Sequence, residues 1–417
     1  MRPRVEVFLE GGCSSPPPRA RESRGAPPSS RGLRPRTGAR EARVVLLLPA
    51  VVLTCSLANG SAPEAAAPAA ADWAAFRGGP QNTGVAEGTL PAKPELKWTF
   101  TAEDGFVATA AIVGGTVYAG SLDGRLYALD LATGKERWRY QAADAIQSSP
   151  LVADGAVYFG DEAGNLHAVD AETGKRRWVF TADGPVTSSP ARAGDCVLAG
   201  SYDNRLYCVD PKTGEAAWSL ETQGYVHGTP AVTSAGEAVV AGCDGMLRRV
   251  RLSDGKETGA VELGGYAAAS PALAAGRAFV GTFENRVQAV DLGAGTIAWS
   301  FAPKREFPFY ASAAVAGAGD GALVIAAGRD REVHALAAGD GAERWSWAAG
   351  AQVDASPVVA GDRVLVATKA GKLAALALAN GEPGWTFDAG AGFDASPAVA
   401  GGRLVIGDED GTLYCFG

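Results

Sequence analysis

A tryptophan recurs along this chain at a nearly constant interval of about 40 residues. The fifth slot of the series, 41 residues after Trp218, holds Gly259 instead. The seven tryptophans of the series are Trp98, Trp138, Trp178, Trp218, Trp299, Trp345 and Trp385. Together with the glycine slot they define eight copies of one unit, so the chain is a repeat protein.

One period of the repeat reads as four short strands. Residues 148–180 contain the apolar runs "SSPLVA", "AVYFG", "NLHAVD" and "RRWVF", separated by the turn-forming clusters "DG", "DEAG" and "AETGK". The 55 glycines of the 417 residues favour an all-β chain with many tight turns over a helical one. The sequence therefore predicts an all-β fold, an eight-bladed β-propeller with four-stranded antiparallel blades.

The two ends of the repeat array are complementary. The last repeat stops at "LYCFG", after its third strand, whereas "LKWTF" at 96–100 is a fourth strand with no repeat before it. We expect the N-terminal strand to complete the last blade, which closes the ring and removes free sheet edges. The predicted propeller domain spans residues 96–417.

The N-terminal region predicts export. Residues 1–43 hold ten arginines and precede an uncharged hydrophobic run at 44–58, so residues 1–58 are predicted to be a basic leader plus secretory signal, cleaved after Ala58. An uncleaved anchor and lipid attachment at Cys55 stay open, and only these would associate the protein with a membrane. Residues 59–95 are expected to be a flexible linker and pre-propeller segment. The expected location is periplasmic or outer-membrane associated.

Charge and cysteine content limit the partners and the chemistry. Beyond residue 43 the chain carries 28 basic and 42 acidic residues, a balance of −14 that repels nucleic acid. Cys196 and Cys208 lie on neighbouring predicted strands, so an exported chain could link them. The position of Cys208 and Cys415 in the repeat is Ala128 in the first copy, which favours a small buried side chain instead.

No catalytic or metal-binding motif stands out. His167 and His334 replace Tyr127 of the first repeat, which predicts ordinary strand residues with hydrogen-bond partners. The acidic run at 407–411 lacks the spaced ligands of a calcium loop. Hydrolase, zinc and nucleotide-binding motifs do not occur. We therefore predict no catalytic residue, no metal site and no cofactor.

Two sets of residues are candidates for binding a partner. The residue before each "SSP" segment is variable and is expected to ring the mouth of the central funnel, as a binding surface or as a solvated channel lining: Ala108, Gln147, Thr187, His227, Ala268, Tyr310, Asp354 and Asp394. The loop at 302–310 is longer than its counterparts and gathers Lys304, Arg305, Phe307, Phe309 and Tyr310. It predicts an interface, with the alternative that Phe307 and Phe309 fold inward over the core.

The frame A-x-D-x-x-T-G-K-x-x-W in "ALDLATGKERW" and "AVDAETGKRRW" resembles the tryptophan-docking repeat of the pyrroloquinoline quinone (PQQ)-like eight-bladed propellers. The segment "DWAAFRGGPQNTGVAEG" at 72–88 is similar to the one that precedes the ring in exported bacterial members. The frame's aspartate becomes Arg251, Ala337 and Ala377 in the fourth, sixth and seventh repeats.

The resemblance implies one of two functional classes. Quinoprotein alcohol dehydrogenases hold PQQ and calcium in the funnel, with an aspartate base and a disulfide between adjacent cysteines. Non-catalytic members, typified by the outer-membrane assembly factor BamB, bind proteins. This chain has no adjacent cysteine pair and is shorter than the dehydrogenases, and its tryptophans are expected on outer strands. We therefore expect a BamB-like, monomeric protein-binding scaffold of the cell envelope. The alternative is a PQQ- and calcium-dependent dehydrogenase.

Overall fold

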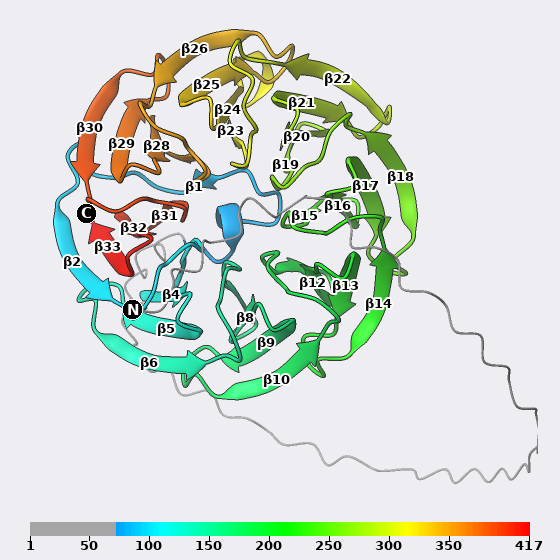
Figure 1. The fold of residues 1–417 in the computed structure, drawn as a ribbon, viewed down its shortest axis with the longest axis vertical. Helices are drawn as coiled ribbons and strands as arrows, with labels where there is room; N and C mark the ends of the chain where they lie inside the picture. The colour runs from blue at the N-terminus through cyan, green and yellow to red at the C-terminus, as the bar shows by residue number, and fades with distance from the viewer. Residues whose placement is uncertain (1–71) are drawn as a thin grey trace, which may run out of the picture. The chain divides into compact units, whose positions relative to one another are not determined.

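A computed structural model describes residues 72–417, and the predicted leader, signal and tether before Asp72 lie outside the described residues. The described chain forms a ring of eight sheets around a central axis (Figure 1). Neighbouring strands within each blade are antiparallel, and the only strand pairing of the other kind described is that of β1 with β27. The prediction of an eight-bladed, all-β propeller is confirmed.

The strands of the first four blades run outward from the axis in chain order. Blade 1 contains β3 (Ala111–Val113), β4 (Thr116–Gly120), β5 (Arg125–Asp130) and β6 (Glu136–Gln141). Blade 2 contains β7 (Leu151–Ala153), β8 (Ala156–Gly160), β9 (Asn165–Asp170) and β10 (Arg176–Thr181). Blade 3 contains β11 (Ala191–Ala193), β12 (Cys196–Gly200), β13 (Arg205–Val209) and β14 (Ala216–Glu221). Blade 4 contains β15 (Ala231–Val232), β16 (Glu237–Ala241), β17 (Met246–Arg251) and β18 (Glu257–Glu262).

The remaining blades follow the same order, except that blade 6 contains a short helix and blade 8 takes three strands from this part of the chain. Blade 5 contains β19 (Ala272–Ala274), β20 (Arg277–Thr282), β21 (Arg286–Asp291) and β22 (Thr296–Phe301). Blade 6 contains β23 (Ala314–Ala316), the short helix η2 (Gly319–Gly321), β24 (Leu323–Ala327), β25 (Glu332–Ala337) and β26 (Glu343–Ala348). Blade 7 contains β27 (Val358–Ala360), β28 (Arg363–Ala367), β29 (Lys372–Ala377) and β30 (Pro383–Asp388), and blade 8 contains β31 (Ala398–Ala400), β32 (Arg403–Gly407) and β33 (Thr412–Phe416).

The ring is closed by its two ends, as the sequence predicts. Strand β2 (Leu96–Thr101) pairs antiparallel with β33 and supplies the outer strand of blade 8, with Trp98 opposite Cys415. In Figure 1 the cyan β2 lies beside the red β33. No blade therefore lacks its fourth strand among the described residues.

The repeated tryptophans join each blade to the next one. The indole Nε1 of Trp98 donates to Leu131 O in blade 1 at 2.9 Å, and that of Trp218 donates to Leu252 O at 2.8 Å. The Thr-Gly glycine of the receiving blade lies flat against the indole, since a Cβ on Gly134 would come 2.7 Å from the Trp98 ring. Gly134 also has a positive φ of 71°, so only glycine suits both demands. The contact of each repeat tryptophan with the turn of the next blade is thus the joint between blades.

The segment before β2 crosses the centre of the ring. It forms the helical turn η1 (Phe76–Gly78) and the strand β1 (Val85–Ala86), which pairs parallel with β27 (Figure 1). Carbonyls of this segment accept hydrogen bonds from the innermost strands of six blades, through the amides of Ile112, Val152, Val232, Leu273, Val315 and Val359. We call residues 72–86 the central segment. The sequence places these residues in a linker and pre-propeller segment, whereas they pack inside the ring.

Two side chains fix the central segment. Arg77 is 1% exposed, and its guanidinium donates to Pro357 O at 2.7 Å and to Ala313 O at 2.9 Å. Asn82 donates through Nδ2 to Thr229 O at 3.1 Å. Gly84 leaves the room that Arg77 needs, because a Cβ at Gly84 would lie 2.0 Å from the guanidinium. Position 84 is therefore glycine because the Arg77 side chain fills the space that any larger residue there would need.

Candidate functional site

A cavity of about 140 Å³ lies at the axis of the ring. The half-buried ring of Phe76 from the central segment forms part of its wall. Eight hydroxyl-bearing side chains, one from each blade, line it as well: Thr109, Ser149, Ser189, Thr229, Ser270, Ser312, Ser356 and Ser396. The same position of every repeat thus contributes to the cavity wall, together with one aromatic residue from outside the repeats.

The hydroxyl ring also holds the blades together at the axis. The amides of six of these residues donate to the hydroxyl of the counterpart in the next blade, as Thr109 N does to Ser149 Oγ at 3.0 Å and Ser312 N does to Ser356 Oγ at 3.0 Å. Bonds of this kind occur at six of the blade boundaries. These hydroxyl oxygens accept a backbone hydrogen bond and keep their own proton for a partner in the cavity.

A ring of variable residues lies next to the hydroxyls, and all eight residues that the sequence singled out line the cavity. In blade 1, however, the prediction is one residue out of register. Because Thr109 is equivalent to Ser149, the counterpart of Gln147 is Val107 and not Ala108. We call the corrected set the inner tier: Val107, Gln147, Thr187, His227, Ala268, Tyr310, Asp354 and Asp394.

A second ring, which the sequence analysis missed, contacts the inner tier. It is formed by the first residue of each turn between the second and third strands of a blade. The amide of each of these residues donates to the loop that enters its own blade, so the backbone is the same eight times. We call this set the outer tier: Leu122, Glu162, Tyr202, Cys243, Phe283, Arg329, Lys369 and Glu409. Its signal in the sequence is a variable residue two positions after each second strand.

Blades 6 and 7 meet in an ion pair beside an aromatic ring. Arg329 Nε lies 3.0 and 3.2 Å from the two carboxylate oxygens of Asp354, and Nη2 lies 2.9 Å from Oδ2. The Arg329 guanidinium also lies 4.0 Å from the centroid of the Tyr310 ring. Burial alone would lower the pKa of Arg329, but the hydrogen bonds and charge of Asp354 outweigh it and raise the pKa. Both oxygens of Asp354 are therefore occupied.

Blades 7 and 8 meet in a second pair of different geometry. Lys369 Nζ lies 2.8 Å from Asp394 Oδ1 and also contacts Glu409. The Asp394 side chain is 5% exposed, yet its Oδ2 has no hydrogen-bond partner among the described residues. Burial raises the pKa of Asp394 to about 6, against the charge of Lys369, which lowers it. One oxygen of this cavity-lining carboxylate is thus buried without a hydrogen-bond partner among the described residues.

The opposite side of the mouth is aromatic. His227 Nδ1 lies 2.8 Å from the hydroxyl of Tyr202, whose ring stacks on Tyr225 at 4.6 Å. Burial lowers the pKa of His227 to about 4, so the imidazole is neutral at pH 7. Phe283 packs on Tyr310 with ring centroids 4.6 Å apart. Gln147, in blade 2, donates to Glu162.

In the loop at 302–310 one phenylalanine is buried and the other is exposed, so each of the two expectations holds for one residue. Phe309 is 1% exposed and packs in the core of blades 5 and 6, as the inward alternative expects. Phe307 is 47% exposed, as an interface residue would be. Lys304 and Arg305 are also exposed, and Arg305 Nη1 donates to Asp330 O at 3.2 Å. The loop is therefore anchored by one phenylalanine and presents the other.

Two of the three histidines contact an aspartate of their own blade. His167 Nε2 lies 2.8 Å from Asp161, and His334 Nε2 lies 2.8 Å from Asp330, each inside its own blade. Tyr127 makes the same contact to Asp123 at 2.6 Å in blade 1. The histidines therefore replace tyrosine in a repeated strand-to-turn hydrogen bond. His227, in the inner tier, is the one that reaches the cavity.

The family model described as "Outer membrane protein assembly factor BamB" matches four overlapping stretches of the chain, residues 90–179, 156–300, 260–346 and 283–417. The chain belongs to this family. Its membership agrees with the tryptophan frame, the ring of eight blades and the closure by β2. No curated protein sequence matches the chain.

Solved structures similar to this BamB-family chain fall into both functional classes. BamB from Moraxella catarrhalis is 17% identical with a TM-score of 0.66, over 78% of this chain and 99% of that one. The quinohemoprotein alcohol dehydrogenase from Comamonas testosteroni is 15% identical with a TM-score of 0.70, over 83% of this chain and 80% of that one. A europium-containing methanol dehydrogenase is 14% identical with a TM-score of 0.69, over 83% and 98%. At these identities the likeness shows the fold alone.

The residues at the cavity of this BamB-family chain do not fit PQQ. Cavities that hold drug-sized ligands measure about 300–1,000 Å³, well above the volume found at the axis. The seven repeat tryptophans lie on the outer strands, away from the cavity lining. Asp354, a candidate base, has both oxygens bound to Arg329. Within residues 72–417 no three His, Cys, Asp or Glu side chains gather in a metal-binding arrangement.

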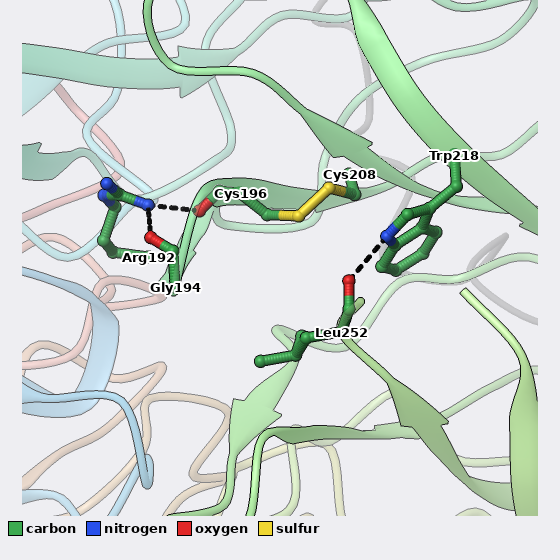
Figure 2. Close-up of a disulfide and its surroundings, with 6 residues drawn as sticks. All are labelled: Arg192, Gly194, Cys196, Cys208, Trp218 and Leu252. Carbon is green, nitrogen blue, oxygen red and sulfur yellow. Dashed lines mark hydrogen bonds between the residues drawn. A yellow bond between two sulfur atoms is a disulfide. The ribbon is translucent and has the colours of Figure 1, made fainter. Parts of the chain in front are cut away.

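A disulfide links Cys196 to Cys208 within blade 3, with the Cα atoms 5.1 Å apart (Figure 2). The preference for an unpaired small side chain at Cys208 is therefore wrong. The equivalence with Ala128 describes the space at that position but ignores Cys196 on the adjacent strand β12. Cys415, at the same position in blade 8, faces a strand without cysteine and is free and buried.

Figure 2 also places the disulfide beside a blade joint. Trp218 follows in β14 and donates to Leu252 of blade 4, while Arg192 donates to the carbonyls of Gly194 and Cys196 in the turn at the other end of the strand. The disulfide thus links β12 to β13 in blade 3, the blade whose Trp218 makes the joint to blade 4.

No helix in the described part of the chain has the length and apolar composition to span a bilayer.

Proposed function

We propose that this chain is a non-catalytic protein-binding scaffold of the bacterial cell envelope, in the manner of BamB. A role in outer-membrane protein assembly would follow from the family description. The Cys196–Cys208 disulfide supports an oxidising, exported location such as the periplasm. Any attachment to the outer membrane would depend on the N-terminal region, which lies outside the described residues.

The observation that carries the proposal is a pair of exposed aromatic residues on one face. Tyr266 and Phe307 are 44% and 47% exposed and belong to different loops. Both loops bond to the same turn, because Phe283 N donates to Tyr266 O at 2.9 Å and Asn285 Oδ1 accepts from Phe307 N at 3.3 Å. Exposed aromatic residues beside arginine are typical of interface hot spots.

A double substitution tests the scaffold role. Arg305→Ala with Phe307→Ala in the full chain should abolish capture of an envelope partner in a crosslinked pull-down. Phe309 anchors the loop, so the thermal unfolding midpoint should stay unchanged. The matched control is Ile297→Ala, which removes an exposed apolar side chain from the outer strand β22. Equal capture by wild type and double variant would reject the interface.

A PQQ and calcium titration tests the dehydrogenase alternative. The cavity chemistry described above predicts no stoichiometric binding and no alcohol-dependent dye reduction. Tight binding with dye reduction would replace the scaffold proposal by a quinoprotein function, with Asp354, Asp394 and His227 as the first residues to substitute.

A further inference from the structure

Oδ2 of Asp394, a residue that lines the cavity, is a buried carboxylate oxygen that no contact among the described residues explains. Asp354, the equivalent residue one blade earlier, accepts from Arg329 with both oxygens. Asp394 accepts from Lys369 with Oδ1 alone, and Oδ2 stays without a partner among the described residues. A buried carboxylate oxygen without a donor costs free energy, so this atom favours a ligand that brings one.

The charge around the cavity selects a cationic donor. Three carboxylates of the two tiers lie on this side of the mouth, namely Asp354, Asp394 and Glu409. Arg329 and Lys369 are the cations paired with them. His227 contributes no charge at pH 7, because burial lowers its pKa. The excess of negative charge disfavours an anion and stabilises a cation.

The size and lining of the cavity limit the cation further. Its volume of about 140 Å³ lies well below the roughly 300–1,000 Å³ of pockets that hold drug-sized ligands, so it favours a small cation such as butylammonium. Phe76 and Ala268 offer apolar contact for the alkyl part. A planar guanidinium needs two oxygens for its paired donors, whereas a compact ammonium can use a single open oxygen.

We propose that the cavity binds a primary alkylammonium group, with Asp394 Oδ2 as its main acceptor and with Phe76 and Ala268 against its alkyl chain. The group could arrive as a free small amine or as the lysine side chain of a docked protein. The site goes beyond the proposed scaffold function, because free amines test it without any protein partner.

The test is a titration of the full chain with n-butylammonium, followed by ligand-observed NMR. We expect saturable binding at about millimolar concentration, and binding of the neutral isostere n-butanol at least tenfold weaker. Asp394→Asn should weaken n-butylammonium at least about tenfold. The matched control is Asp362→Asn in blade 7, whose side chain is 92% exposed and which should bind like wild type.

A second variant covers the case in which Asp394→Asn does not fold. Glu409→Gln removes a charge that is 35% exposed and frees Lys369 for Asp394, so it should weaken the amine about threefold. Parallel titration with N-acetyl-lysine methylamide separates the sources. Equal affinity for both amines supports a lysine side chain as the occupant, and binding of n-butylammonium alone supports a free amine. Absence of amine binding, or equal binding by Asp394→Asn, overturns the proposal and leaves the pull-down result unaffected.

Discussion

The central segment and the mouth of the cavity use the same eight repeats in opposite ways. The central segment contacts the blades through backbone amides at equivalent positions, and its carbonyls accept from six blades with nearly identical geometry. The mouth presents side chains that differ at equivalent positions, from Thr187 to Asp394. Backbone bonds do not depend on side-chain identity, so the ring keeps its geometry while the mouth varies. Substitutions should therefore act on stability at one end and on binding at the other.

The largest effect is expected at Arg77. Arg77→Ala removes the donors of two buried carbonyls and leaves a cavity, so the free energy of unfolding should fall by about 3–5 kcal/mol. Urea unfolding measures the change, and Arg344→Ala on the exposed surface is the control. A loss below about 1 kcal/mol would mean that the central segment is not needed to hold the ring.

The next effect is expected at Asn82, where two substitutions separate the side chain from the backbone. Asn82 has a φ of 54° and bonds Thr229 O through Nδ2. Asn82→Ala should cost about 2 kcal/mol, because it loses the bond and strains the left-handed backbone. Asn82→Gly relieves that strain and should cost about 1 kcal/mol. The reverse order in urea unfolding would contradict the role of the side-chain bond.

Low pH should weaken amine binding at the mouth by protonating Asp394. Its neighbours Lys369, Glu409 and Asp354 set the raised pKa of about 6 together with burial. Below that pH the carboxyl takes up a proton and cannot pair with a cation, so n-butylammonium affinity should fall about tenfold between pH 7.5 and 5. Ligand-observed NMR at the two pH values checks this. An affinity that is constant with pH would assign the amine to another group.

The smallest stability effects are expected in the inner tier. Thr187→Ala and Gln147→Ala remove half-buried side chains that no blade joint uses, so each should change the free energy of unfolding by less than about 0.5 kcal/mol. Thermal and urea unfolding test this against Arg77→Ala. A fall of more than about 1 kcal/mol in the free energy of unfolding at either position would show that the side chains of the mouth also stabilise the ring.

The sequence predicts the ring well because its determinants are local and repeated. The tryptophan spacing, the Thr-Gly turns and the strand runs fix eight blades, and the missing fourth strand predicts the pairing of β2 with β33. The inner tier follows from the same register, except in blade 1, where "ATAA" contains neither the serine nor the proline of the "SSP" marker.

What the sequence does not predict depends on contacts between distant residues. The central segment has no repeat pattern, so the bonds of Arg77 to Pro357 and Ala313 cannot be inferred from spacing. The outer tier has a constant position but no constant residue type. The difference between Asp354 and Asp394 is invisible in sequence, because it depends on whether the preceding blade supplies an arginine or a lysine.

The closure by β2 has a consequence for the order of folding. Strand β2 leaves the ribosome long before its partner β33 is made. Each blade can form from local hairpins as it emerges, whereas joining residues 96–101 to 412–416 requires a loop closure across the whole array. The edge of β2 therefore stays unpaired until β33 has been synthesised. We expect a slow final phase of refolding that reports this single strand pairing, and a need for chaperones until it is complete.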